Sequence, residues 1–142
     1  MSNSELTDGA NFGLMEWGHP YRYIRSSARM NDPYQGWRYN WYGTKIIEPV
    51  SKDGAANIYS KIEDVHPGGG TYLRQALQLS NNYYKGASSP VIKGATCQAN
   101  YLIVISDGYW SRHSSVLAIA DSLNKSNNIK TFAVGFALGS AN

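Results

Sequence analysis

The stretch Asn100–Gly108, "NYLIVISDG", carries the strongest strand pattern in the chain. Its run Tyr101–Ile105 is apolar without a break, whereas a strand with one solvated face alternates apolar and polar residues. The run therefore predicts a strand that is covered on both faces, as in a parallel sheet. Ser106, Asp107 and Gly108 end the run abruptly and place a carboxylate at the carboxyl end of the strand.

Apolar and amphipathic segments alternate on both sides of this strand. After it, the pattern predicts a helix over residues 114–127 and a second buried strand over residues 129–136, "IKTFAVGF". Strand, helix and strand in this order form a right-handed parallel unit. Before it, the same reasoning predicts two helices and two strands, over residues 53–65, 71–84, 10–17 and 44–50. We therefore expect an α/β fold in which residues 10–17 form a further buried parallel strand.

Residues 19–43 interleave Tyr and Trp with Arg. The segment has no sustained hydrophobic period and contains Pro, Gly and Asn-Asp-Pro, so we interpret it as an irregular insertion. Rigid aromatic side chains beside Arg are good binding anchors, because they bury area at small entropic cost. The residues that we expect to contact a partner are Trp37, Arg38, Tyr39 and Trp41. The alternative is that the aromatic rings fold back over the edge of the sheet.

Composition narrows the possible classes of protein. The 142 residues are enough for one domain with one core, so we treat residues 1–142 as a single domain. The net charge of +3 is scattered along the chain, which argues against a nucleic-acid partner, and no apolar run is long enough to span a membrane. No nucleophile elbow, phosphate loop or zinc-ligand spacing occurs, so we do not expect an enzyme. The single cysteine, Cys97, is either a buried thiol or half of a disulfide whose partner lies outside this chain.

Thr71 and Asp107 are the candidate metal ligands. Thr71 follows the glycines of Gly68–Gly70 and opens the helix expected from residue 71. In parallel sheets ligands bind beyond the carboxyl ends of the strands, so we expect both side chains at one rim. A hydroxyl and a carboxylate suit Mg²⁺ or Ca²⁺, but Mg²⁺ takes six ligands, and two residues leave most of them to water. The alternatives are that Thr71 is an ordinary helix N-cap and that Asp107 forms a turn before Gly108.

The segments "GGGTYLRQAL", "NYLIVISDG" and "IKTFAVGF", in this order, resemble the von Willebrand factor A domain. Together with "ANFGLMEWG", they resemble more narrowly the A domain of PilY-type adhesins at the tips of type IV pili. The resemblance implies a Rossmann-like fold with a central, mostly parallel sheet and helices on both faces. It also implies that Thr71 and Asp107 belong to a metal-ion-dependent adhesion site that binds Mg²⁺ or Ca²⁺.

The chain departs from the family pattern at one important place. The DxSxS loop, which completes the metal site at the end of the family's first strand, is absent from the sequence. We therefore expect an incomplete A domain that lacks the family's first strand and its C-terminal end. Another segment, another chain or a rearranged sheet would then fill the place of the missing central strand. For the same reason we expect this chain alone to bind a divalent cation weakly or not at all.

The resemblance implies a binding module at the cell surface or pilus of a bacterium. Its partners would be a protein ligand or other pilus components, contacted through a degenerate or incomplete metal site. Two alternatives remain open. One is a structural protein-interaction module without metal function, and the other is a subunit of an intracellular complex similar to the metal chelatases.

Overall fold

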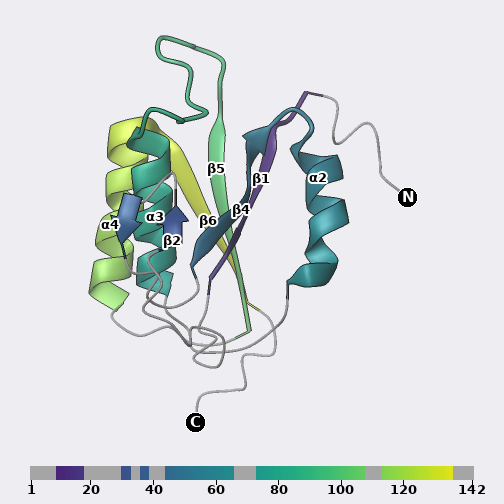
Figure 1. Cartoon of the computed structure of the whole chain (residues 1–142). Coiled ribbons are helices and arrows are strands. Elements are labelled where there is room, and N and C mark those ends of the chain that lie inside the picture. Colours follow the sequence, from purple (N-terminus) through teal and green to yellow (C-terminus); the bar gives the residue numbers. More distant parts are fainter. Residues whose placement is uncertain are drawn as a thin grey trace.

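The computed structural model describes residues 9–17, 30–32, 36–38, 44–65, 73–107 and 113–135. Over these residues the chain is a mixed α/β structure whose strands form three two-stranded sheets. The helices are α2 (Gly54–Lys61), α3 (Leu73–Lys85) and α4 (His113–Asn127), with a 3₁₀ turn, η1 (Ile62–Asp64), after α2. Helices α3 and α4 lie on one side of the long strands and α2 lies on the other (Figure 1).

The strand–helix–strand unit expected around residue 100 is present. Strands β5 (Asn100–Ser106) and β6 (Ile129–Gly135) pair in parallel, with Asn100 opposite Ile129 and Ser106 opposite Gly135. Helix α4 connects them and ends at Asn127; the next residue, Asn128, has a φ of 52°, the left-handed conformation that often terminates helices. These bounds confirm the predicted strands and the predicted helix between them.

The pairing of the N-terminal strand differs from the prediction. Strand β1 (Phe12–Glu16) pairs antiparallel with β4 (Lys45–Ser51), so that Phe12 lies opposite Ser51 and Glu16 opposite Lys45. The prediction that residues 10–17 form a buried parallel strand is wrong, because β1 is antiparallel and its residues are exposed or half-buried. An apolar run indicates an extended segment but contains no information on the direction of its partner.

Part of the aromatic segment forms a short hairpin. Strands β2 (Met30–Asp32) and β3 (Gly36–Arg38) pair antiparallel, with Asn31 opposite Trp37. The interpretation of residues 19–43 as irregular is therefore wrong for these two stretches. Strands of three residues are too short to produce a visible hydrophobic period, which explains why the sequence did not reveal them.

Helix α3 is the strongly amphipathic helix that the sequence predicts. Its buried residues include Leu73, Ala76, Leu77, Ser80 and Tyr84, which follow the spacing of one helical face. The hydroxyl of Ser80 donates a hydrogen bond to the carbonyl of Ala76 (3.0 Å), so this buried polar group is satisfied within the helix.

Two clusters of buried side chains form the core, and both include residues of α3. The first contains Leu73, Ala76, Leu77, Val104 and Val116, with the partly buried Met15, Trp17, Leu102, Ile119 and Ala120 around it. The second contains Tyr83, Tyr84, Leu123 and Ile129, with Ile46, Val50, Val91, Leu102 and Ile119 around it. Each cluster thus joins a residue of the β1–β4 pair to a residue of the β5–β6 pair, although the two pairs belong to separate sheets.

Hydrogen bonds from α3 reach both strand pairs as well. The backbone N–H of Val50 on β4 donates to the hydroxyl oxygen of Tyr83 (2.9 Å). The hydroxyl of Tyr84 donates to the carbonyl of Tyr101 on β5 (3.4 Å). Two successive residues of one helix therefore anchor the two pairs, and α3 is the element that holds the described fold together.

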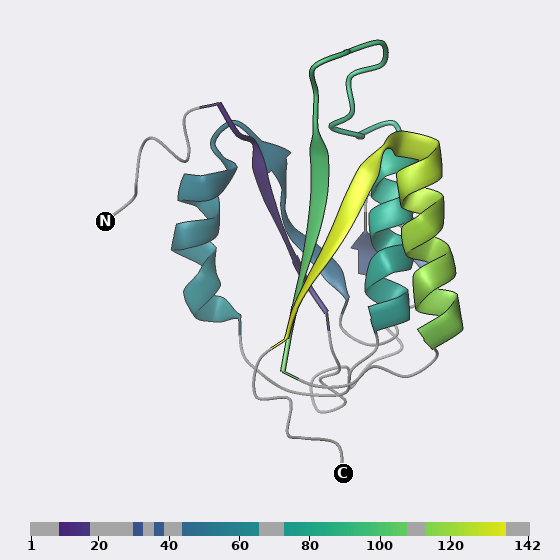
Figure 2. The ribbon, with the colours of Figure 1, turned by 180° about the vertical axis from the view of Figure 1, so that it is seen from behind.

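Helix α2 covers the other side of the β1–β4 pair. Gly54 begins this helix at a place where a Cβ atom would lie 1.9 Å from the carbonyl oxygen of Phe12. Only glycine allows the helix to begin this close to β1. As seen from behind, α2 lies beside β1 and β4, while β5 and β6 have no helix on that side among the described residues (Figure 2).

The outer face of the β5–β6 pair is exposed. Alternate residues Leu102, Val104 and Ile129 point into the core, and the residues between them point away from it. The large side chains on this outer face are each at least half exposed, and we call them the bare face: Tyr101, Ile103, Ile105, Phe132 and Val134. The prediction that the strand over residues 101–105 is covered on both faces is wrong for the part of the chain that the structure describes.

Candidate functional site

Asp107 stands at the carboxyl end of β5, as the sequence predicts. Its side chain is exposed, whereas the preceding residue, Ser106, is buried. Thr71, the other candidate ligand, lies outside the described residues. Within the described ranges no group of three or more His, Cys, Asp or Glu residues could hold a metal ion. Among the described residues Asp107 thus provides one carboxylate, whereas Mg²⁺ and Ca²⁺ take six to eight oxygen ligands.

Two of the four candidate partner-binding residues lie in the short hairpin. Trp37 and Arg38 belong to β3, where their backbones lie opposite Asn31 and Met30 of β2. The other two, Tyr39 and Trp41, lie outside the described residues. The hairpin therefore places Trp37 and Arg38 at neighbouring positions of one strand.

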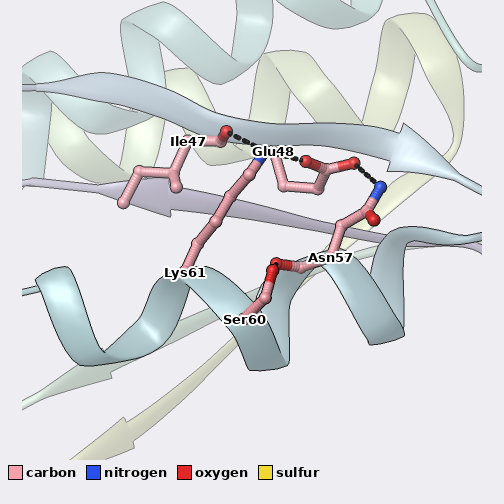
Figure 3. Close-up of polar contacts among 5 residues, drawn as sticks. All are labelled: Ile47, Glu48, Asn57, Ser60 and Lys61. Atoms are coloured by element: carbon pink, nitrogen blue, oxygen red, sulfur yellow. Dashed lines mark hydrogen bonds and ion pairs between the residues drawn. The ribbon is translucent and has the colours of Figure 1, made fainter.

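A buried carboxylate on β4 is the best-defined polar site in the described structure (Figure 3). The side chain of Asn57 donates to one Glu48 oxygen (Oε1, 2.8 Å), and the ammonium of Lys61 lies 2.5 Å from the other (Oε2). The Lys61 ammonium also donates to the carbonyl of Ile47 (3.4 Å). Both donors belong to α2, four residues apart on one face of the helix.

The electrostatics of this cluster follow from its hydrogen bonds. The pKa of Glu48 is lowered, first by the hydrogen bond from Lys61 and then by the one from Asn57, while burial opposes the shift. The carboxylate is thus ionised and fully engaged at neutral pH. Because α2 provides both donors and β4 provides the acceptor, the cluster attaches the helix to the strand. The sequence signal for it was Glu48 standing inside the apolar stretch "TKIIEPV", which the prediction did not use.

The tyrosines of α3, Tyr83 and Tyr84, are buried in the core. Burial raises the pKa of the Tyr84 phenol, and the neighbouring Tyr83 contributes to the shift. The rings of these two residues lie with centroids 5.5 Å apart and planes tilted by 58°. The Asn127 amide donates to the carbonyl of Tyr84 (3.3 Å), which connects the end of α4 to α3.

Residues 86–99 form an ordered loop between α3 and β5, which projects beyond the ends of the strands (Figure 1). The side chain of Gln98 braces it, because its amide nitrogen donates to the carbonyl of Pro90 (2.9 Å) and its amide oxygen accepts from the N–H of Ile92 (2.7 Å). Gly94 adopts a φ of +82° at the turn. Cys97 is exposed and is a free thiol in the described structure, so the interpretation of it as a buried thiol is wrong.

The bare face is the most distinctive exposed surface in the described residues, and sequence reasoning missed it. Ile103 lies opposite Phe132 in the parallel register and Ile105 lies opposite Val134. The rings of Tyr101 and Phe132 lie with centroids 6.0 Å apart. The continuous apolar run did indicate that both faces of β5 are apolar, and the sequence could not show that one of them is uncovered.

None of the helices in the described ranges is long and apolar enough to cross a membrane.

The comparisons with known proteins give one partial similarity. No protein-family model matches the chain, and no solved structure matches it. Over 80 residues the chain is 30% identical to the type IV pilus biogenesis factor PilY1 of Pseudomonas aeruginosa (strain PAK). This alignment covers 49% of the chain and 7% of PilY1, so the chain spans a small fraction of the length of this relative.

Proposed function

We propose that this chain is a non-catalytic binding module of a bacterial protein that assembles type IV pili or lies at their tips. The observation that carries the proposal is the similarity to PilY1, a type IV pilus biogenesis factor. The parallel β5–α4–β6 unit supports it, because its two strands contain the segments "NYLIVISDG" and "IKTFAVGF" of the von Willebrand A resemblance. Its partners would be pilus components or a protein ligand, and its location would be the pilus or the cell surface.

The same proposal includes an incomplete von Willebrand A fold. Both strand pairs pack on α3 yet belong to separate sheets, which is compatible with a further strand between them. Another segment or another chain would supply that strand and the missing metal ligands. Thr71 and Asp107 would then contribute to a shared Mg²⁺ or Ca²⁺ site, which this chain does not bind tightly alone.

A structural role without a metal is the second candidate. It is favoured by the exposed Asp107, which has too few oxygen ligands near it in the described residues to hold a cation. In that case the module would support pilus assembly by protein contacts alone.

Deletion of the coding sequence in the source bacterium tests the proposed function. We expect loss of surface pili and of pilus-dependent twitching motility, restored by the wild-type gene. Pili sheared from the cells and quantified by immunoblot measure the first effect. Unchanged piliation and motility in the deletion strain would contradict the proposal.

A matched pair of carboxylate variants separates the metal-dependent role from the structural one. Asp107→Ala should abolish complementation if the metal site operates, because it removes the one described candidate ligand. Asp121→Ala removes an exposed carboxylate on α4 and is the control. Full complementation by both variants would support the structural role and rule out a metal-dependent one.

A further inference from the structure

We propose that the end of the molecule at the 86–99 loop binds the surface of an anionic lipid bilayer. The side chain of Ile92 enters the headgroup region, and the lysines around it contact lipid phosphates. The inference goes beyond the proposed pilus role and does not depend on it. An apolar side chain that projects among basic residues is the arrangement by which proteins bind membrane surfaces without crossing them.

The structure gathers lysines that are scattered in the sequence. The hydrogen bond from the Asn127 amide to the carbonyl of Tyr84 joins the ends of α3 and α4. The pairing of Asn100 with Ile129 places the start of β6 beside the end of the 86–99 loop. All of these lie at the end of the molecule from which the loop projects (Figure 1). Four exposed lysines lie on these segments, and we call them the basic end: Lys85, Lys93, Lys125 and Lys130.

The basic end has little negative charge of its own. Residues 82–101 and 120–131 contain these lysines and one carboxylate, Asp121, which pairs with Lys125 (2.7 Å). Lys85 and Lys125 lie in the last turns of α3 and α4, where the helix dipole favours a cation. Lys93 lies on the loop and Lys130 on β6, so the helix ends do not account for these two. They are therefore the lysines most available to an anionic surface.

The loop presents Ile92 on a fixed support. Val91 packs against the second core cluster, whereas the next side chain, Ile92, is 67% exposed. The N–H of Ala95 donates to the carbonyl of Ile92 (3.2 Å), and Gln98 braces the loop on the other side of this turn. Because the loop is already ordered, Ile92 can be buried in a partner at small conformational cost.

The small size of this surface favours a bilayer over a protein as the partner. One isoleucine and the stems of a few lysines on a projecting loop cover far less than the ~800 Å² that a protein partner usually buries. A bilayer requires no such area, because the insertion of an apolar side chain and the attraction of each lysine add to one another. The attraction falls off within about 8 Å at physiological salt. We therefore expect weak binding that high salt abolishes.

Co-sedimentation of the purified chain with lipid vesicles tests the proposal. We expect binding to vesicles of phosphatidylcholine that contain phosphatidylglycerol, and none to vesicles of phosphatidylcholine alone. Lys93→Gln and Lys130→Gln should each lower the partition coefficient about fivefold, which is the usual contribution of a lysine at an anionic surface. Ile92→Ser should lower it at least about tenfold, because the buried apolar side chain is lost.

Two variants elsewhere in the molecule are the matched controls. Lys45→Gln makes the same change of charge at the start of β4, at the opposite end of the molecule (Figure 1). Ile103→Ser removes an isoleucine that is 61% exposed on the bare face. Both should bind anionic vesicles as the wild type does, and circular dichroism establishes that all variants are folded. Equal binding to neutral vesicles would overturn the proposal, and so would a loss in Ile103→Ser as large as that in Ile92→Ser.

A fluorescent label on the loop tests which end of the molecule meets the lipid. Cys97 is the single cysteine of the chain and its thiol is exposed on the loop, so an environment-sensitive dye can be attached there alone. We expect its emission to shift to the blue with anionic vesicles and to stay unchanged with neutral ones. Vesicle binding without this shift would overturn the proposal. Binding to immobilised polyglutamate without binding to vesicles would also overturn it, in favour of an acidic protein partner.

Discussion

At the scale of single residues, Glu48 shows how a polar group is tolerated inside an apolar strand. A buried carboxylate is costly unless hydrogen bonds and an opposite charge compensate it. Asn57 and Lys61 provide both, and the two residues belong to α2, the helix that packs beside β4. The cluster thus converts a costly buried charge into a specific attachment of α2.

Replacing Glu48 by Gln should lower the melting temperature, because the charge-assisted bond to Lys61 is lost. The matched control is Asp121→Asn, which removes an exposed ion pair with Lys125 on α4 (2.7 Å). Exposed pairs of this kind contribute about 0.3–0.5 kcal/mol, so the control should change stability little. Differential scanning calorimetry measures the melting temperatures of both variants at neutral pH. Equal decreases would show that the Glu48 cluster stabilises the protein no more than an exposed ion pair does.

The pH dependence follows from the direction of the pKa shift. The pKa of Glu48 is lowered from its ordinary value of 4.5, so the folded state binds the proton less readily than the unfolded chain. The stabilisation is fully present above pH 4.5 and is lost as the pH falls through the lower, folded-state pKa. The difference in melting temperature between wild type and Glu48→Gln should therefore shrink as the pH falls below 4.5. A difference in melting temperature that stays constant down to pH 3 would show that the ionised Glu48 carboxylate is not the source of the stabilisation.

At the scale of elements, α4 has one buried face and one exposed face. Leu123 is fully buried between α3 and β6, whereas Leu117 is 66% exposed. Leu123→Ala should destabilise the protein by about 2–5 kcal/mol, because it leaves a cavity in the second core cluster. Leu117→Ala should change the free energy of unfolding by less than about 0.5 kcal/mol. Urea unfolding measures both, and similar losses for the two variants would mean that α4 packs by a different face.

The elements differ in how far their sequences predict them. The bounds of α3, α4, β5 and β6 could be predicted, because each has an apolar period or run that matches one geometry. The direction of β1 could not, since pairing partners are decided by tertiary contacts such as those of Met15 with the α3 cluster. The hairpin of β2 and β3 was also missed, because each strand has three residues.

At the scale of the whole molecule, one helix organises an asymmetric arrangement. Helix α3 contacts both strand pairs, while α2 covers the β1–β4 pair from the opposite side (Figures 1 and 2). The β5–β6 pair therefore has one face in the core and one bare face. Sequence reasoning placed Asp107 correctly at the end of β5, because a strand that ends in Asp-Gly positions its last carboxylate at the rim. It could not reveal the bare face, since the sequence of an apolar strand is the same whether or not another element covers it.

The structural account depends on one claim, which is that β5 and β6 are parallel and in the register that joins Ile103 to Phe132. Nuclear Overhauser effects between backbone protons of the two strands in the isotope-labelled chain test this claim most directly. We expect a parallel ladder in which contacts advance together along both strands, from Asn100 with Ile129 to Ser106 with Gly135. Contacts that run in opposite directions along the two strands, or a ladder shifted by one residue, would contradict the account.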